Sequence, residues 1–180
     1  MIYSYKQCKE RIGSDFLMLR EIECGHLYKL AAGAYSYTPD HSELELFQFL
    51  YPNAVFTMGS AFYYHELTDV VPEKLEIASV RDSSKIKLDY VKQHFYPEKT
   101  FSIGVSQIEW QGEPLKLYDK ERMLIELIRH KNKIPFDFYK EIVTSYRNVV
   151  MDLDTQKLED YTIHFPASKK ILDTIQLEIF

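Results

Sequence analysis

The chain has 180 residues, 46% of them apolar and 27% charged, and its formal net charge is −5. This composition is typical of a packed soluble protein and excludes a disordered chain, and no apolar run approaches the ~20 residues that cross a bilayer. The negative charge argues against a protein that coats nucleic acid, and two cysteines with no apolar secretion signal at the start lead us to expect a cytoplasmic protein.

The first 38 residues predict a miniature winged helix. Two short helices come first, over residues 5–12 and 15–24. Each has a serine as its N-cap and a glycine after its end; these are Ser4 and Gly13, then Ser14 and Gly25. Two short strands follow, 27–30 and 34–37, around a turn at 31–33. Helix, helix and wing in this order are a common means of entering a DNA major groove.

The two parts of the chain differ in charge. Residues 1–38 hold five basic and four acidic side chains, a net charge of +1, so the remainder carries −6. Between them lies a short polar stretch, 38–41, whose proline disfavours helix at the residue before it. We therefore predict two domains, 1–38 and 39–180. Since phosphate contacts supply most DNA affinity, so weakly basic a module needs two copies to bind DNA well.

Residues 39–180 predict an α+β domain, because period-2 patterns and short apolar runs give way to apolar stripes at helical spacing. The expected strands are 54–56, 74–80, 90–96, 104–110 and 113–118, the last two as a hairpin. The first expected helix runs from the Ser42–Glu45 capping box to Tyr51-Pro52, and the others cover 58–67, 120–130, 135–150, 155–165 and 169–180. The expected N-caps of the helices that begin at 58, 120, 155 and 169 are Thr57, Asp119, Asp154 and Ser168. The predicted fold is thus a small winged-helix-like module followed by an α/β domain with a mixed or antiparallel sheet and a helical C-terminal third.

The second predicted helix supplies the candidates for DNA contact. Polar residues at the start of such a helix meet base edges, and cations beside it meet phosphates. The groove-facing candidates are Ser14, Asp15 and Arg20, and the phosphate-facing candidates are Lys6, Arg11 and Lys29. The same helix holds four consecutive apolar residues, 16–19, which cannot all point inward. The alternative is a packing or dimerising subdomain with an exposed apolar edge.

A second candidate functional surface lies in the C-terminal domain. It comprises Arg81, Asp82, Lys85, Lys87 and Arg122. Metal-dependent cleavage by Asp82 would need a second carboxylate on the ion, so we favour a solvated loop over a nuclease. Arg122, on the first turn of a predicted helix, can bind a phosphate or be anchored by a carboxylate, and we favour the structural role.

No motif for a metal, a cofactor or catalysis is found. His65-Glu66 has no second His at the zinc-helix spacing, and the two Cys form no C-x-x-C pair. A phosphate-binding loop and a nucleophile elbow are also missing. We expect no metal, no cofactor and no enzymatic activity.

Several stretches together carry a resemblance to a known family. They are residues 25–30, 33–35, 51–57, 60–69 and 118–127. In their order and spacing they resemble the AbiEi antitoxins, transcriptional regulators of type IV toxin–antitoxin pairs in phage defence by abortive infection. By this similarity Gly33 and Tyr35 match the wing turn, which adds Tyr35 to the DNA-binding candidates. Ser60-Ala61 and Glu121-Arg122 match two helix starts.

The resemblance implies an N-terminal winged helix that binds and represses the promoter of its own operon. It also implies a C-terminal domain that counteracts a nucleotidyltransferase-type toxin. We therefore expect an antitoxin and autoregulator that binds operator DNA, as a homodimer or on two half-sites. The alternative is a protein-interaction module that neutralises a toxin without binding DNA, and a weaker one is a metal-dependent nuclease.

Overall fold

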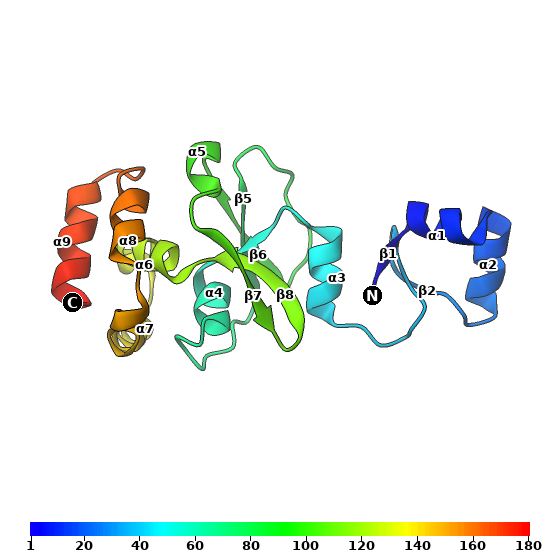
Figure 1. Ribbon diagram of the computed structural model, residues 1–180, viewed down its shortest axis with the longest axis horizontal. Coiled ribbons are helices and arrows are strands. Elements are labelled where there is room, and N and C mark those ends of the chain that lie inside the picture. Colours follow the sequence, from blue (N-terminus) through cyan, green and yellow to red (C-terminus); the bar gives the residue numbers. More distant parts are fainter. The chain divides into compact units, whose positions relative to one another are not determined.

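The computed structural model describes residues 1–180 and divides into two units, Met1–Asn53 and Ala54–Phe180. The α+β class predicted from the sequence is confirmed (Figure 1). Helix α3 (Glu43–Leu50) belongs to the first unit by its contacts, whereas the boundary we predict lies before this helix. None of the helices combines the length and the apolar composition that crossing a bilayer requires.

The first unit contains a winged-helix-like module. Its elements follow one another as β1 (Tyr3–Ser4), α1 (Tyr5–Ile12), α2 (Asp15–Glu23), β2 (Tyr28–Ala31) and β3 (Ala34–Ser36). The three strands form an antiparallel sheet in the order β1-β3-β2, so the last strand is central. Strand β1 is absent from the sequence prediction, because two residues are too few to show a period.

Local capping sets the ends of the two helices of this module. Ser4 and Gln7 form a reciprocal capping box on α1, and the Ser14 hydroxyl accepts a hydrogen bond from the Leu17 N–H at 3.3 Å on α2. Gly13 and Gly25 then take positive φ angles of 101° and 74°. Both helices therefore start and stop where the sequence predicts, within one residue.

The wing is tighter than predicted. Ala31 pairs with Ala34, so only two residues form the turn instead of three. Gly33 holds a φ of 80°, a left-handed conformation that a side chain would oppose. On α3, Ser42 caps as predicted, but the reciprocal half of its capping box is not formed. The Glu45 carboxylate lies 3.6 Å from the amino group of Met1 instead.

The second unit is built on a five-stranded mixed sheet in the order β6-β5-β4-β8-β7. Its strands are β4 (Val55–Phe56), β5 (Leu75–Val80), β6 (Val91–Tyr96), β7 (Val105–Trp110) and β8 (Glu113–Tyr118). Strands β7 and β8 form the predicted hairpin, while β5–β6 and β4–β8 are parallel pairs. Gln111 and Gly112 both have positive φ, as a tight hairpin turn requires.

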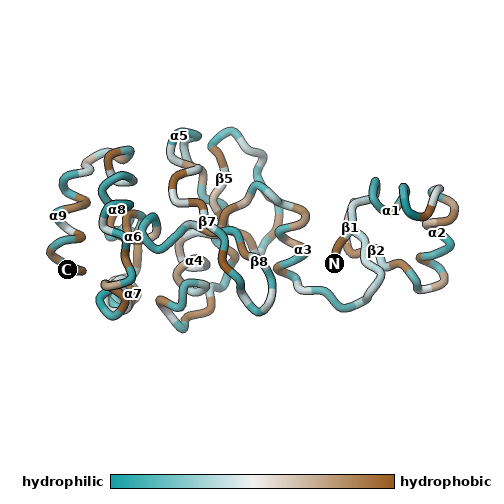
Figure 2. Tube along the Cα trace, viewed as in Figure 1, coloured by the Kyte–Doolittle hydropathy of each residue, from teal (hydrophilic) through white to brown (hydrophobic).

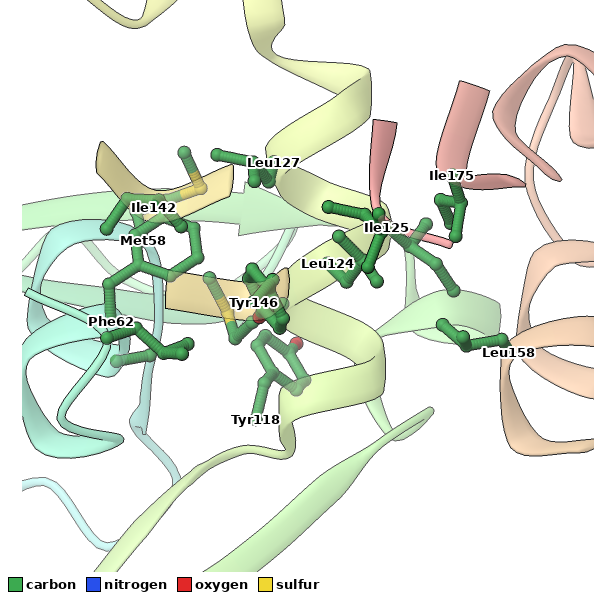
Figure 3. Close-up of a cluster of buried hydrophobic side chains, with 14 of the residues drawn as sticks. Met58, Phe62, Tyr118, Leu124, Ile125, Leu127, Ile142, Tyr146, Leu158 and Ile175 are labelled. Atoms are coloured by element: carbon green, nitrogen blue, oxygen red, sulfur yellow. The ribbon is translucent and has the colours of Figure 1, made fainter. Parts of the chain in front are cut away.

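The helices of the second unit pack around α6. They are α4 (Met58–Tyr64), the short α5 (Glu98–Phe101), α6 (Lys120–Arg129), α7 (Phe136–Asn148), α8 (Thr155–Thr162) and α9 (Ser168–Glu178), with 3₁₀ turns η1 (Lys131–Lys133) and η2 (Val150–Asp152). Seven consecutive residues of α6, 121–127, are buried. Side chains of α4, α7, α8 and α9 converge on it, together with Tyr118 of β8 (Figure 3). Met123, Leu124, Ile125 and Leu127 supply the apolar part of this buried segment, and its other three residues are charged.

Two predicted caps fail for identifiable reasons. Thr57 occupies the N-cap of α4, but its fully buried hydroxyl faces the sulfur of Met123 at 3.7 Å and makes no cap bond. The N-cap of α9 is Ala167, in the left-handed region at φ 60°, so Ser168 is already inside the helix.

Candidate nucleic-acid interface

Helix α2 and the wing carry most of the candidate DNA-binding residues. Arg20 on α2 and Lys29 on β2 are exposed, as are Lys6 and Arg11 on α1. The Arg11 guanidinium lies 4.4 Å from the Tyr3 ring centre, and Lys6 is 4.0 Å from Glu10. All four cations are therefore accessible to a phosphate, and their present partners are at the surface, where ion pairs are weak.

Asp15 and Ser14 are already engaged within the module. The Asp15 carboxylate accepts hydrogen bonds from the Tyr5 hydroxyl and from Lys9 at 3.0 Å. These two partners hold the pKa of Asp15 below its ordinary value. Ser14 serves as the N-cap of α2. The two residues thus fix the start of the helix, and their contact with the groove stays a prediction.

Tyr35 is not a surface residue, which corrects its place among the DNA-binding candidates. It is 8% exposed and packs with Cys8, Met18 and Leu27 in the core of the first unit. The cause is the packing of α1 and α2 on this face of the sheet, through Cys8 and Met18. A ring on the covered face of a central strand has no route to a ligand.

The apolar run of α2 is mostly exposed. Of residues 16–19 only Met18 enters the core, whereas Phe16, Leu17 and Leu19 are 74%, 40% and 60% exposed. The apolar segment occupies the first half of α2 (Figure 2). The sequence already contained this signal, since a helix of nine residues against a small sheet buries one narrow face.

The candidate surface of the C-terminal domain splits in two. Arg81, Asp82, Lys85 and Lys87 are all exposed in the connection between β5 and β6. The Gln93 side chain holds this connection by accepting a hydrogen bond from the Ile86 N–H and donating one to the Ser84 carbonyl. The connection contains no helix, in agreement with a polar loop.

Arg122 is fully buried, so it does not belong to that surface. It donates to the Thr100 and Ile103 carbonyls at 2.6 and 2.9 Å, and its Nε donates to Glu126 at 3.0 Å. Its second terminal nitrogen, Nη2, lies 2.9 Å from the same carboxylate, although without hydrogen-bond geometry. Aromatic rings stack around it: Tyr118 at 4.5 Å and Phe165 at 4.6 Å. The structural role that we favour for Arg122 agrees with this burial.

Glu126 anchors this arginine from one turn further along α6. It is also fully buried, and it accepts hydrogen bonds from Arg129 at 2.8 and 2.9 Å. Burial alone would raise the pKa of Glu126, but the hydrogen bond with His130 and the charges of Arg122 and Arg129 hold it below its ordinary value. The carboxylate is therefore ionised in the folded protein.

No cluster of three or more His, Cys, Asp or Glu side chains could hold a metal ion. Depressions in the second unit include one of about 280 Å³ between α8 and α9 and one of about 520 Å³ between the end of α6 and α9. The larger is lined by Arg129, Lys131 and Lys170, but also by Glu178, and Lys131 is paired with Glu178.

Comparison with known proteins gives a fold likeness. No protein-family model matches the chain, and no curated protein sequence matches it. Among solved structures, the crystal structure of the RV2827C protein from Mycobacterium tuberculosis is similar, with a TM-score of 0.60. The identity is 13%, over 97% of this chain and 72% of that chain. At this identity the two proteins share a fold, and the likeness extends over nearly the whole of this chain.

Proposed function

We propose that the chain is a DNA-binding antitoxin that acts by binding and not by turnover. Its first unit would bind the promoter of its own operon, and its second unit would counteract a nucleotidyltransferase-type toxin in the cytoplasm. The observation that carries the DNA-binding part is the module β1-α1-α2-β2-β3 with strand order β1-β3-β2 and an exposed second helix. This is the arrangement in which winged helices present a helix to the major groove.

Charge limits the affinity of one copy. Four exposed cations lie on α1, α2 and the wing, namely Lys6, Arg11, Arg20 and Lys29. The net charge of residues 1–38 is nevertheless only +1. Each neutralised phosphate adds a salt-dependent increment of affinity, so one copy with few cations binds weakly. The proposed complex therefore contains two copies of the chain on neighbouring half-sites.

The antitoxin part rests on the resemblance of residues 51–57, 60–69 and 118–127 to the AbiEi family. In the structure these stretches form β4-α4 and β8-α6, and their central residues are buried, including Ser60, Ala61 and Arg122. The resemblance is thus carried by residues that build the second unit. It supports a shared domain, but the buried residues that carry it do not form the surface that would bind the toxin.

A mobility shift with the chain's own upstream DNA tests the first part of the proposal. With four phosphate contacts in each of two copies, raising the salt from about 50 to about 200 mM should weaken binding roughly 10⁴-fold. Arg20→Ala combined with Lys29→Ala should reduce this salt effect to about 100-fold, since two contacts are lost in each copy. The matched control is Lys99→Ala with Lys133→Ala, two exposed lysines of the second unit. No retarded band at low salt would end the DNA-binding proposal.

A second candidate function is toxin neutralisation through α2 without DNA. The exposed Phe16, Leu17 and Leu19 favour it, because contiguous apolar surface marks contact sites. Co-expression with the neighbouring toxin gene separates the two functions in the full-length chain. If α2 binds the toxin, Phe16→Ala with Leu19→Ala abolishes rescue of growth. If α2 binds DNA, the same variant rescues growth but loses repression.

A further inference from the structure

The start of α2 presents an unusual surface for a helix that meets DNA. Phe16, Leu19 and Arg20 are spaced i, i+3 and i+4, so they share one face, and all three are exposed. Asp15, the other polar residue there, is held by Tyr5 and Lys9. This face therefore offers outward two large apolar side chains and one guanidinium, with the exposed Glu23 carboxylate at its far end.

The size of this face fits a groove better than it fits a protein partner. A nine-residue helix is about 14 Å long, close to the ~12 Å width of the major groove. A stable protein interface buries about 800 Å² on each partner, far more than one side of such a helix can supply. A second copy or a toxin seated on this face alone would bind weakly.

The charges around the face are complementary to DNA. Asp15 is paired with Lys9, and the other acids of α2 stand in its second half, where Glu21 lies 3.1 Å from His26. Exposed cations remain on the last turn of the helix, at Arg20, and in the wing, at Lys29. The first half of α2 is thus apolar with cations nearby, which suits base edges bordered by phosphates.

We propose that Phe16 and Leu19 contact thymine methyl groups in the major groove, which makes them specificity-determining residues. This inference rests on the proposed DNA-binding function. The C5 methyl of thymine is the apolar group that base pairs expose in the major groove, and apolar side chains are its usual partners. Arg20, on the same face, contacts an adjacent guanine or phosphate. The operator then contains thymines under α2 in each half-site.

Replacing thymine by uracil tests the proposal, because uracil lacks only the methyl group. The full-length chain is titrated with a duplex of its own upstream DNA and with the same duplex carrying deoxyuridine throughout the protected region. Each buried methyl contributes roughly a three- to fourfold gain in affinity, so two half-sites with one methyl for each of the two side chains predict about a 100-fold weaker complex. Phe16→Ala with Leu19→Ala should bind the thymine duplex about as weakly, and should not distinguish it from the uracil duplex.

The control is Leu177→Ala, an exposed apolar residue of the second unit, which should keep the thymine preference. Equal, salt-dependent binding of both duplexes by the unaltered chain overturns the methyl contacts and leaves DNA binding in place. Binding of neither duplex overturns both. If the double variant keeps the thymine preference but no longer neutralises the toxin, the apolar face serves a protein partner and the inference is wrong.

Discussion

Removing the Glu126 carboxylate tests whether the buried charge cluster holds the second unit together. In Glu126→Gln the Arg122 guanidinium stays fully buried and keeps its carbonyl acceptors at Thr100 and Ile103, but its countercharge is gone. Removing one partner of a buried pair costs about 3–5 kcal/mol, because the remaining charge is not compensated. For a unit of about 130 residues this lowers the melting temperature by roughly 10–20 °C.

Thermal unfolding followed by tryptophan fluorescence measures this effect. Trp110 is the one tryptophan of the chain and lies in the second unit, where its ring packs at 5.6 and 5.3 Å from those of Tyr63 and Tyr64. Glu159→Gln, an exposed change of the same chemistry, is the matched control and should stay within about 0.5 kcal/mol. A decrease for Glu126→Gln as small as that of the control would refute the reasoning, since the pair would then contribute nothing.

Three further predictions concern the same unit. Gly104→Ala should lower the free energy of unfolding by about 1–3 kcal/mol more than Gly112→Ala does. Both glycines have positive φ, but only the new Cβ at position 104 would lie 2.5 Å from the Arg122 Cβ. Equal melting temperatures of the two variants would contradict this prediction. The pKa of Glu126 is lower in the folded protein than in the unfolded chain. Its ionised carboxylate therefore contributes fully to the free energy of unfolding above the unfolded pKa of about 4.3, and this contribution is lost as pH falls through the folded pKa. The acid unfolding of Glu126→Gln should lack this pH-dependent contribution. Burial raises the folded pKa of six tyrosines, so the phenolate absorbance of this set should appear only on alkaline unfolding. Ionisation of all tyrosines while the protein is still folded would contradict this prediction; the set is Tyr64, Tyr96, Tyr118, Tyr139, Tyr146 and Tyr161.

Features that depend on near neighbours in sequence could be predicted. Ser14 caps α2, and Asp119 caps α6 by accepting from the Arg122 N–H at 2.9 Å. The Gln111-Gly112 turn joins β7 to β8 as expected. In each case the hydrogen bond or the turn involves residues within a few positions of one another, so the local sequence contains the whole interaction.

Features that depend on residues distant in sequence could not be predicted. The burial of Tyr35 follows from Cys8 and Met18, which lie on two separate helices and whose packing against β3 no local pattern reveals. The depth of Arg122 follows from carbonyl acceptors at Thr100 and Ile103, in a connection that the sequence marks neither as helix nor as strand. An arginine on a first helical turn has the same sequence signature whether its partner is solvent, phosphate or backbone.

The position of the family-like residues decides where function should be sought. Ser60, Ala61, Glu121 and Arg122 are all less than a tenth exposed. Three of them hold other segments in place: Ser60 accepts from the Glu76 N–H, Glu121 accepts from the Asp154 N–H, and Arg122 donates to two backbone carbonyls. Substituting such residues unfolds the second unit before it removes any single activity. DNA binding and toxin neutralisation should therefore be separated at exposed positions, first on α2, where apolar side chains face solvent without a partner in their own unit. A pattern that resembles a family can thus be informative about the fold and still fall on residues that no partner touches.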